Sequence, residues 1–194
     1  MVWSKKSVVK SAALAAGFAG VLALGSSNAV AGAAPQVPHR GADSPRAVLV
    51  RELSLRLAAY PGQVANVEGG SQQNGAPVIQ YPWTGKPNER WEADAMGNGY
   101  YRFRSLSSGK CLNVEGGGTA DNTRVIQYTC GTAANELWKF VPKGIGYQLV
   151  VKSSGKCLNV RGGVGEGRNL IQYTCVAAGA PNEVWLPVWE PVGP

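Results

Sequence analysis

A four-residue motif, Asn-Glu-x-Trp, recurs in this chain at a fixed step. It begins at Asn88, Asn135 and Asn182, so consecutive copies are 47 positions apart. An Asn side chain offers hydrogen-bond donors and acceptors, and an ionised Glu offers acceptors only. Side chains of these types can hold a polar ligand by hydrogen bonds, or they can hold one another in place. The Trp of each copy is a large apolar side chain that is expected in a core.

The repetition extends well beyond this motif. The segment GQVANVEGG (62–70) returns as GKCLNVEGG (109–117) and GKCLNVRGG (155–163). Likewise, VIQYPW (78–83) returns as VIQYTC (125–130) and LIQYTC (170–175). Three units of about 47 residues are each too small to bury a core alone, so we expect them to fold together as one domain.

Each unit is predicted to contain short β-strands separated by Gly-rich turns. The chain has 194 residues, of which 44% are hydrophobic, 26 are Gly and 12 are Pro, a composition that favours strands and turns over helices. Alternating apolar residues predict strands at 101–105 and 147–151, with further strands near 112–114, 125–127 and 138–140. Four strands in each of three units predict an all-β fold of twelve strands with pseudo-threefold symmetry, a β-trefoil without helices. Three tryptophans are then equivalent core residues, namely Trp91, Trp138 and Trp185.

The first unit departs from the other two. Val64 stands where the second unit has Cys111, and Trp83 stands where it has Cys130. Both cysteines are replaced together by apolar residues, as expected for two positions that are neighbours in space. Alternating leucines at 53–57 supply the first strand, so we expect the domain to span 47–190 and to be followed by a short tail at 191–194.

The four cysteines form two pairs of nearly equal spacing. Cys111 and Cys130 are 19 positions apart, and Cys157 and Cys175 are 18 apart. Because each pair lies inside one unit, the repeat favours within-unit disulfides among the three possible connectivities. Each such disulfide would stabilise the fold by roughly 3 kcal/mol. A zinc site is the alternative, but the spacing is not CxxC and the only histidine, His39, lies outside the repeats, so no metal site is predicted.

The N-terminal segment has the pattern of a secretory signal peptide. Three lysines within the first ten residues precede an apolar stretch at 11–24 and small residues at 29–31. We expect residues 1–31 to be removed, with a cut after Ala33 as the alternative site. A retained membrane anchor is the competing interpretation, but the apolar stretch is short for a bilayer. The mature chain would then begin with a flexible, Pro-containing tether at 32–46 and would have no membrane span.

The net charge gives no support for nucleic-acid binding. Loss of the first 31 residues removes three lysines and no acidic residue, so the formal charge falls from +7 to +4. The remaining basic residues form no dense patch of the kind that nucleic-acid binding requires.

These features resemble the ricin B-type lectins, which are carbohydrate-binding β-trefoils, and especially their secreted bacterial members. The resemblance covers about residues 47–190 and rests on SGKCLNV (108–114 and 154–160), the Gly-Gly turns, the YTC segments and the closing Trp. In that family the closing motif is Gln-x-Trp, and the first half of the unit reads Cys-Leu-Asp-Val. In this chain Glu replaces that Gln and Asn replaces that Asp in every unit, at Glu89, Glu136 and Glu183 and at Asn66, Asn113 and Asn159.

The resemblance implies that the two exchanged side chains meet beneath a bound sugar. An amide and a carboxylate remain in contact after the exchange, so Glu can still brace Asn with the ends reversed. The other interpretation is that Glu bonds to backbone groups alone. Because the acceptor carboxylate has moved away from the sugar, galactose specificity does not follow from the resemblance.

The resemblance also implies one sugar pocket in each unit. One face of a sugar packs on an aromatic ring, while amides at the rim fix the directions of its hydroxyls. Ten positions separate Val160 from Leu170, where the other units have eleven, so we expect the first two pockets to be better formed. The implied sugar-contacting residues are Asn66, Tyr81 and Asn88 in the first unit, Asn113, Tyr128 and Asn135 in the second, and Asn159, Tyr173 and Asn182 in the third.

We therefore expect a secreted protein that binds glycans or polysaccharides through up to three weak sites and uses no cofactor. Several weak contacts to one polymer would strengthen binding. The alternative is a β-trefoil that binds a protein, for example a secreted protease inhibitor, through a single loop. That function requires one distinctive loop, whereas the polar set here occurs three times. An enzyme is not expected, because no Ser/His/Asp set and no separate acidic pair can be recognised.

Overall fold

The computed structural model describes residues 52–191. The expected signal peptide at 1–31 and the expected tether at 32–46 lie outside the described residues, as do residues 47–51 and 192–194. All statements below concern the described part of the chain.

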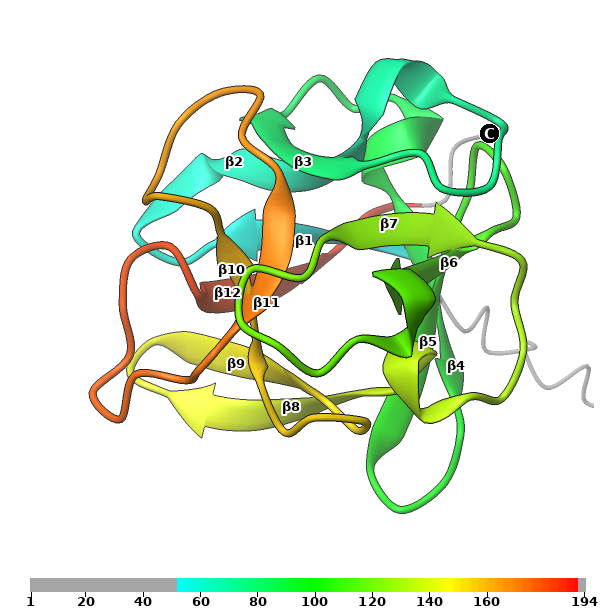
Figure 1. Cartoon of the computed structure of the whole chain (residues 1–194). Coiled ribbons are helices and arrows are strands. Elements are labelled where there is room, and N and C mark those ends of the chain that lie inside the picture. The colour runs from blue at the N-terminus through cyan, green and yellow to red at the C-terminus, as the bar shows by residue number, and fades with distance from the viewer. Residues whose placement is uncertain (1–51, 192–194) are drawn as a thin grey trace, which may run out of the picture. The chain divides into compact units, whose positions relative to one another are not determined.

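The fold is an all-β trefoil of twelve strands, as the repeat predicted. Each unit contributes four consecutive strands, and the last strand begins at the closing Trp in the first two units and one residue before it in the third. The strands are β1 (Glu52–Leu57), β2 (Tyr60–Val67), β3 (Val78–Pro82), β4 (Trp91–Ala95), β5 (Tyr100–Ser105), β6 (Cys111–Val114), β7 (Val125–Tyr128), β8 (Trp138–Lys143), β9 (Gly146–Val151), β10 (Cys157–Val160), β11 (Leu170–Tyr173) and β12 (Val184–Trp189), as labelled in Figure 1.

Four single-turn 3-10 helices, which the sequence pattern did not predict, connect strands of the first two units. They are η1 (Glu68–Gly70), η2 (Pro87–Glu89), η3 (Glu115–Gly117) and η4 (Ala134–Glu136). Within residues 52–191 the third unit has no such turn, and no helix is long and apolar enough to cross a membrane.

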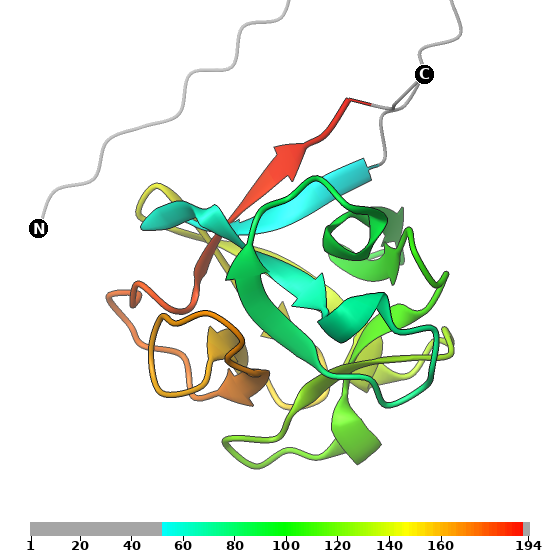
Figure 2. The ribbon, with the colours of Figure 1, turned by 90° about the horizontal axis from the view of Figure 1, so that it is seen from above.

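The strands pair in antiparallel fashion within units and between them. The hairpins β2–β3, β6–β7 and β10–β11 are the equivalent second and third strands of the three units. The first and last strands close the domain, because β1 pairs with β12 from Leu53 opposite Trp189 to Leu57 opposite Trp185. Figure 2 shows these two strands side by side. Residues 52–191 therefore form one closed domain.

The three closing tryptophans lie in the core, as predicted. Each is fully buried, and each indole N–H donates to a backbone carbonyl of the second strand of its own unit. Trp91 donates to Ala65 at 3.2 Å. The distances for Trp138 and Trp185 are both 3.0 Å. These bonds satisfy the one polar group of each indole, so the ring can be buried without leaving a donor unpartnered.

A buried glutamine in the third strand of each unit joins that unit to a neighbouring unit. Gln127 donates a backbone N–H bond to the carbonyl of Ala76 at 2.9 Å. Its side-chain Nε2 donates to the carbonyls of Ser71 and Gln73 at 2.7 and 2.9 Å. The equivalent Gln172 binds the loop of the second unit in the same way. The polar residue at the centre of each IQY segment is therefore a link between units.

The first unit closes the ring with a different side-chain arrangement. Gln80 donates to the Gln63 side chain at 2.9 Å, and its own oxygen accepts the Gly165 N–H at 2.9 Å. In the second unit the glutamine oxygen instead accepts the hydroxyl of Ser108 at 2.6 Å. Pro61 stands at the position of this serine in the first unit and has no hydroxyl to donate. Gln80 is thus free to bind the loop of the third unit with its oxygen.

The predicted disulfides are confirmed. Cys111 is bonded to Cys130 and Cys157 to Cys175, each within its own unit. In the first unit, where neither cysteine is present, the Trp83 N–H donates to the Gly62 carbonyl at 2.8 Å. The Trp83 ring also lies 4.4 Å from the Arg56 guanidinium carbon, a cation–π contact that holds this segment without a covalent bond.

A charged contact adds to the link between the second and third units. The Asp121 carboxylate accepts bonds from Lys156 Nζ at 2.6 Å and from the Thr174 N–H at 2.9 Å. The bond from Lys156, helped by Thr174, lowers the pKa of Asp121 below its usual value. Asn74 makes a neutral version of this contact with Thr129 between the first two units, at 3.0 Å.

We expect Gln127→Leu to destabilise the protein by about 1–3 kcal/mol, because it removes the buried amide that binds two carbonyls of the first unit and the Ser108 hydroxyl. The free energy of unfolding in urea measures this effect. Gln73→Leu, at an exposed site in the same loop, is the matched control and should change it by less than about 0.5 kcal/mol. Equal effects of the two substitutions would contradict the role assigned to Gln127.

We expect Asp121→Asn to destabilise the protein at neutral pH but not in acid. The lowered pKa means that ionised Asp121 stabilises the fold above the unfolded-state pKa near 4, and that this contribution is lost as the pH falls below it. The melting temperatures of wild type and variant should therefore converge between about pH 5 and pH 2. A difference that stays constant over this range would rule out the charged contact as its source.

Candidate functional site

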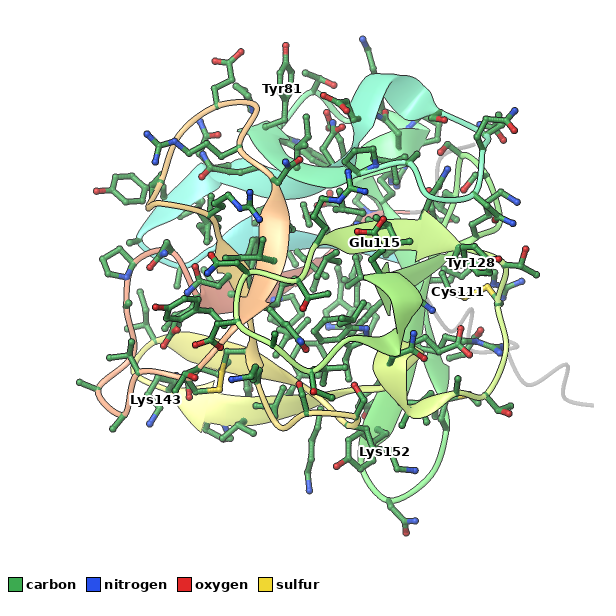
Figure 3. The ribbon with its side chains drawn as sticks, viewed as in Figure 1. Tyr81, Cys111, Glu115, Tyr128, Lys143 and Lys152 are labelled. Atoms are coloured by element: carbon green, nitrogen blue, oxygen red, sulfur yellow. A yellow bond between two sulfur atoms is a disulfide. The ribbon has the colours of Figure 1, made fainter. Side chains whose placement is uncertain are left out.

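Three surface hollows, one in each unit, gather the residues that the sequence predicted. Their volumes are about 480, 490 and 380 Å³ for the first, second and third unit. We call them pockets 1, 2 and 3. Tyr81 of pocket 1 and Tyr128 of pocket 2 lie at different edges of the molecule in Figure 3. The pockets are therefore separate sites on one domain.

Local strand geometry explains how each pocket receives its residues. Along β3 the side chains of Val78 to Gln80 are buried, and Tyr81 at the end of the strand is exposed. The antiparallel register sets Asn66 of β2 directly opposite Ile79, and both line pocket 1. Ile126 and Ile171 occupy the same place in the other two pockets. The isoleucine thus forms an apolar floor beside the tyrosine ring.

All nine predicted contact residues line the pockets, three in each. Glu89 and Glu136 also line theirs, whereas Glu183 is fully buried beneath pocket 3. The residues brought together are Asn66, Tyr81 and Asn88 in pocket 1, Asn113, Tyr128 and Asn135 in pocket 2, and Asn159, Tyr173 and Asn182 in pocket 3.

The asparagine of the closing motif is fixed by two hydrogen bonds in every unit. In pocket 1, Asn88 Nδ2 donates to Asn66 Oδ1 at 3.1 Å and to the Val67 carbonyl at 2.9 Å. The same pair of bonds has lengths of 2.9 and 2.9 Å in pocket 2 and of 2.8 and 3.0 Å in pocket 3. Both amide hydrogens are therefore used within the protein, and the amide oxygen is the atom left to accept a bond from a ligand.

The expected contact between Asn and Glu is present in two of the three units. Asn66 Nδ2 donates to Glu89 Oε1 at 3.1 Å, and the equivalent bond from Asn159 to the buried carboxylate of its unit is 3.2 Å. Within the described residues, no hydrogen bond joins Asn113 to Glu136. The prediction that the two side chains brace each other in every unit is therefore wrong for the second unit.

The glutamates also bind the backbone of the loop that follows the tyrosine. Glu89 accepts bonds from the N–H groups of Thr84 and Gly85 at 2.7 and 2.9 Å, and from the Thr84 hydroxyl at 2.8 Å. With the bond from Asn66, four donors converge on one carboxylate. An ionised carboxylate only accepts, so it suits this setting, whereas a glutamine would turn an NH₂ group toward N–H donors. This explains why Glu occupies the position.

The other two units repeat this arrangement with fewer donors. Glu136 accepts the N–H bonds of Gly131 and Ala133, both at 3.0 Å. Glu183 accepts the Val176 N–H at 2.9 Å and a buried glutamine amide at 2.7 Å. In the first and third units the glutamate therefore bonds to both the asparagine and the loop backbone, and only in the second does it bond to backbone groups alone.

The charged residues at the pocket rims differ between units. Glu68 and Lys86 both line pocket 1. In pocket 2, Glu115 forms a bidentate ion pair with Arg124 at 2.5 and 2.9 Å. These bonds lower the pKa of Glu115 and raise that of Arg124. In the third unit, Arg161 stands at the position of this glutamate. The pockets therefore share one frame of Asn, Tyr, Ile and Glu but differ in the charged residues near their rims.

Pocket 3 is the smallest, which agrees with the shorter loop of its unit. The first two pockets have a 3-10 turn at the Gly-Gly segment, and Gly69 and Gly70 adopt left-handed φ angles of 60° and 64° there. The third unit lacks this turn and has Arg161 where the turn begins in the others.

Comparison with known families and structures identifies the domain. The family described as "Ricin-type beta-trefoil lectin domain-like" matches residues 54–128, 96–173 and 134–193, in three overlapping segments. The chain belongs to this ricin-type lectin family. No curated protein matches the sequence.

Solved structures agree with this assignment. A designed threefold-symmetric protein, ThreeFoil, is 36% identical, with a TM-score of 0.67 over 71% of this chain and 97% of the other. An exo-β-1,3-galactanase from Clostridium thermocellum is 29% identical with a TM-score of 0.66, over 72% of this chain but 30% of the enzyme. The Rhizoctonia solani agglutinin shares the fold at 16% identity, with a TM-score of 0.63 over 72% of this chain and 94% of the agglutinin.

Each pocket of this lectin-type domain also contains a residue from another unit, which the sequence analysis missed. Gly167 of the third unit lines pocket 1, Gly75 of the first lines pocket 2, and Asn122 of the second lines pocket 3. The signal that could have revealed them is their position, since each stands three residues before the third strand of its own unit. Their contribution depends on how the units pack.

We expect a double-mutant cycle to distinguish the braced unit from the unbraced one. Combining Asn66→Asp with Glu89→Gln should show a coupling energy of about 0.5–3 kcal/mol, because Asn66→Asp alone sets two carboxylates in contact. Chemical denaturation at neutral pH measures the four unfolding free energies. The matched control is the cycle of Asn113→Asp with Glu136→Gln, which should show a smaller coupling. Equal coupling in both cycles would contradict the structural difference.

Proposed function

We propose that the protein is a secreted lectin that binds glycans through up to three weak sites, one in each unit, and carries out no reaction itself. The observation that carries this proposal is the threefold recurrence of one arrangement. In each pocket an exposed tyrosine ring stands beside an isoleucine floor and an asparagine oxygen that internal hydrogen bonds hold in place. Membership of a lectin-type family supports the same ligand class.

The chemistry of the pocket suits a pyranose ring. Tyr81, Tyr128 and Tyr173 are 37%, 48% and 40% exposed, so each offers a ring face to the C–H face of a sugar. The amide oxygen of the closing asparagine can accept a bond from a sugar hydroxyl. Asn66 and its equivalents are almost fully buried, so we assign them the positioning of that asparagine rather than the main ligand contact.

Shallow pockets with few polar contacts favour weak binding at each site. Three such sites on one domain can engage one polymer together, and the apparent affinity then exceeds that of any single site. A polysaccharide or a glycan-covered surface is therefore a better ligand than a free monosaccharide. Because a similar structure is a β-1,3-galactanase, β-1,3-galactan is the first polymer to test.

Secretion is part of the proposal. Residues 1–31 have the pattern of a signal peptide, and the two disulfides are compatible with an extracellular protein. The protein would then meet glycans outside the cell that makes it.

A protein-binding role is the second candidate, and one apolar hollow favours it. This hollow of about 220 Å³ is formed by the β1–β2 turn, the β8–β9 turn and the loop between β11 and β12. Ile145 in that turn is 79% exposed, beside Pro181 and Val184. If protein binding were the function, Ile145→Asp would abolish it, and the tyrosine substitutions below would have no effect.

We expect Tyr81→Ala and Tyr128→Ala each to weaken binding to a recognised polysaccharide, by about tenfold if each ring contributes about 1.4 kcal/mol. Tyr173→Ala should have a smaller effect, because pocket 3 is the smallest. A glycan array that includes β-1,3-galactan would first identify the ligand, and affinity electrophoresis would then compare the variants.

Tyr60→Ala is the matched control, since Tyr60 is 50% exposed and lies outside the three pockets. Tyr81→Phe should retain binding, because the ring face is preserved. Undiminished binding in the triple variant of Tyr81, Tyr128 and Tyr173 would refute the proposed sites, and a protein that binds no glycan would refute the proposed function.

A further inference from the structure

Each pocket is completed by one residue from another unit, and that residue is held firmly. Its backbone N–H donates to the carbonyl of the buried glutamine in the third strand of the unit whose pocket it lines. The bonds run from Gly167 to Gln80, from Gly75 to Gln127 and from Asn122 to Gln172, at 2.8, 2.9 and 3.0 Å. Figure 1 shows the β10–β11 loop, which carries Gly167, beside β2 and β3. The wall of each pocket therefore has a fixed position set by the contact between two units.

The backbone at this position limits which residues can stand there. The φ angles of Gly167, Gly75 and Asn122 are 72°, 82° and 67°, all in the left-handed region. Glycine adopts this region freely, and asparagine is among the side chains that tolerate it best. Exchange between Gly and Asn can therefore alter the pocket wall while preserving the path of the chain.

The two residue types make different walls. An added Cβ at Gly75 or Gly167 would meet no heavy atom within 4 Å, so pockets 1 and 2 are open on this side. In pocket 3 the same place holds the exposed side chain of Asn122. That pocket is also the smallest, at about 380 Å³ against about 480 and 490 Å³.

The Asn122 side chain is available to a ligand. Its backbone is held on both sides, because its N–H donates to Gln172 and its carbonyl accepts a bond from Arg161 Nη2 at 2.9 Å. Within the described residues its side-chain amide makes no hydrogen bond. A fixed backbone with a free amide at the pocket rim is suited to donate to, and accept from, sugar hydroxyls.

We propose that the residue at this position decides which part of a glycan chain each pocket accepts. Gly167 and Gly75 leave pockets 1 and 2 open, so a chain can continue from the bound sugar across the boundary to the neighbouring unit. Asn122 closes this path in pocket 3 and binds a hydroxyl of a terminal sugar. The inference rests on the proposed carbohydrate function. It adds that pockets 1 and 2 bind sugars within a glycan chain and that pocket 3 binds the sugar at its end.

The test uses full-length proteins in which one pocket is left intact. Tyr128→Ala with Tyr173→Ala leaves pocket 1, and Tyr81→Ala with Tyr128→Ala leaves pocket 3. The probes are a monosaccharide and its linear tetrasaccharide, with galactose and β-1,3-galactotetraose as the first pair. If the array identifies another polymer, the corresponding pair from that polymer is used. Chemical-shift titration by NMR measures weak binding and shows in the same spectra whether each variant is folded.

Reciprocal substitutions should move the chain-length preference in opposite directions. In the pocket 1 protein, Gly167→Asn should lower the ratio of tetrasaccharide to monosaccharide affinity by about tenfold, which corresponds to about 1.4 kcal/mol. In the pocket 3 protein, Asn122→Gly should raise that ratio by a similar factor and weaken binding of the monosaccharide. Gly97→Asn is the matched control, because Gly97 also has a left-handed φ of 81° with no heavy atom near an added Cβ, and it lies outside the pockets.

The outcomes separate this inference from the function on which it rests. If the wild type binds glycans but neither substitution changes the ratio, the inference is overturned and the lectin function stands. An equal loss for both sugars in Gly167→Asn would also overturn it, because the pocket as a whole would then have been damaged. If the wild type binds no glycan on the array, the proposed function itself fails.

Discussion

The structure depends on hydrogen bonds that each unit makes to a neighbouring unit, the second to the first, the third to the second and the first to the third. At the centre of every third strand, a buried glutamine holds the loop of another unit through its backbone, and Gln127 and Gln172 also do so through their side-chain amides. The pairing of β1 with β12 closes the same ring at the chain ends. No unit can therefore complete its core or its pocket alone, and the three pockets exist only in the assembled domain.

The second constraint is the buried carboxylate under each pocket. Glu89, Glu136 and Glu183 are almost fully buried and accept four, two and three hydrogen bonds, of which backbone N–H groups donate two, two and one. A buried acceptor of this kind is stable only when donors surround it. The carboxylate thus ties the loop after the tyrosine to the closing motif, so that the pocket has a firm frame. The contact to the neighbouring asparagine varies between units, whereas the contact to the loop backbone is present in all three.

A shared frame allows the rims to differ. Three sets of charged side chains lie outside the core. They are the ion pair of Glu115 with Arg124, the side chains of Glu68 and Lys86 that line pocket 1, and the Arg161 guanidinium that donates to the Asn122 carbonyl. Changes there cost little stability, because exposed charges contribute weakly to folding. Three copies of one pocket can therefore diverge at their rims while the domain remains folded.

The sequence by itself determined whatever repeats at a fixed local spacing. The strand pattern, the buried tryptophans, the two disulfides and the gathering of Tyr, Asn and Glu in each unit all follow from residues that occupy equivalent places in three copies. Only the tertiary structure decided contacts that depend on small distances or on other units. Asn113 and Glu136 stand at the same spacing as Asn66 and Glu89, yet only the second pair is hydrogen-bonded, because loops of different composition set the two carboxylates differently. Asn122 enters a pocket of the third unit although it belongs to the second, because the glutamine contact between units brings that loop there, and spacing along the chain carries no information about such packing.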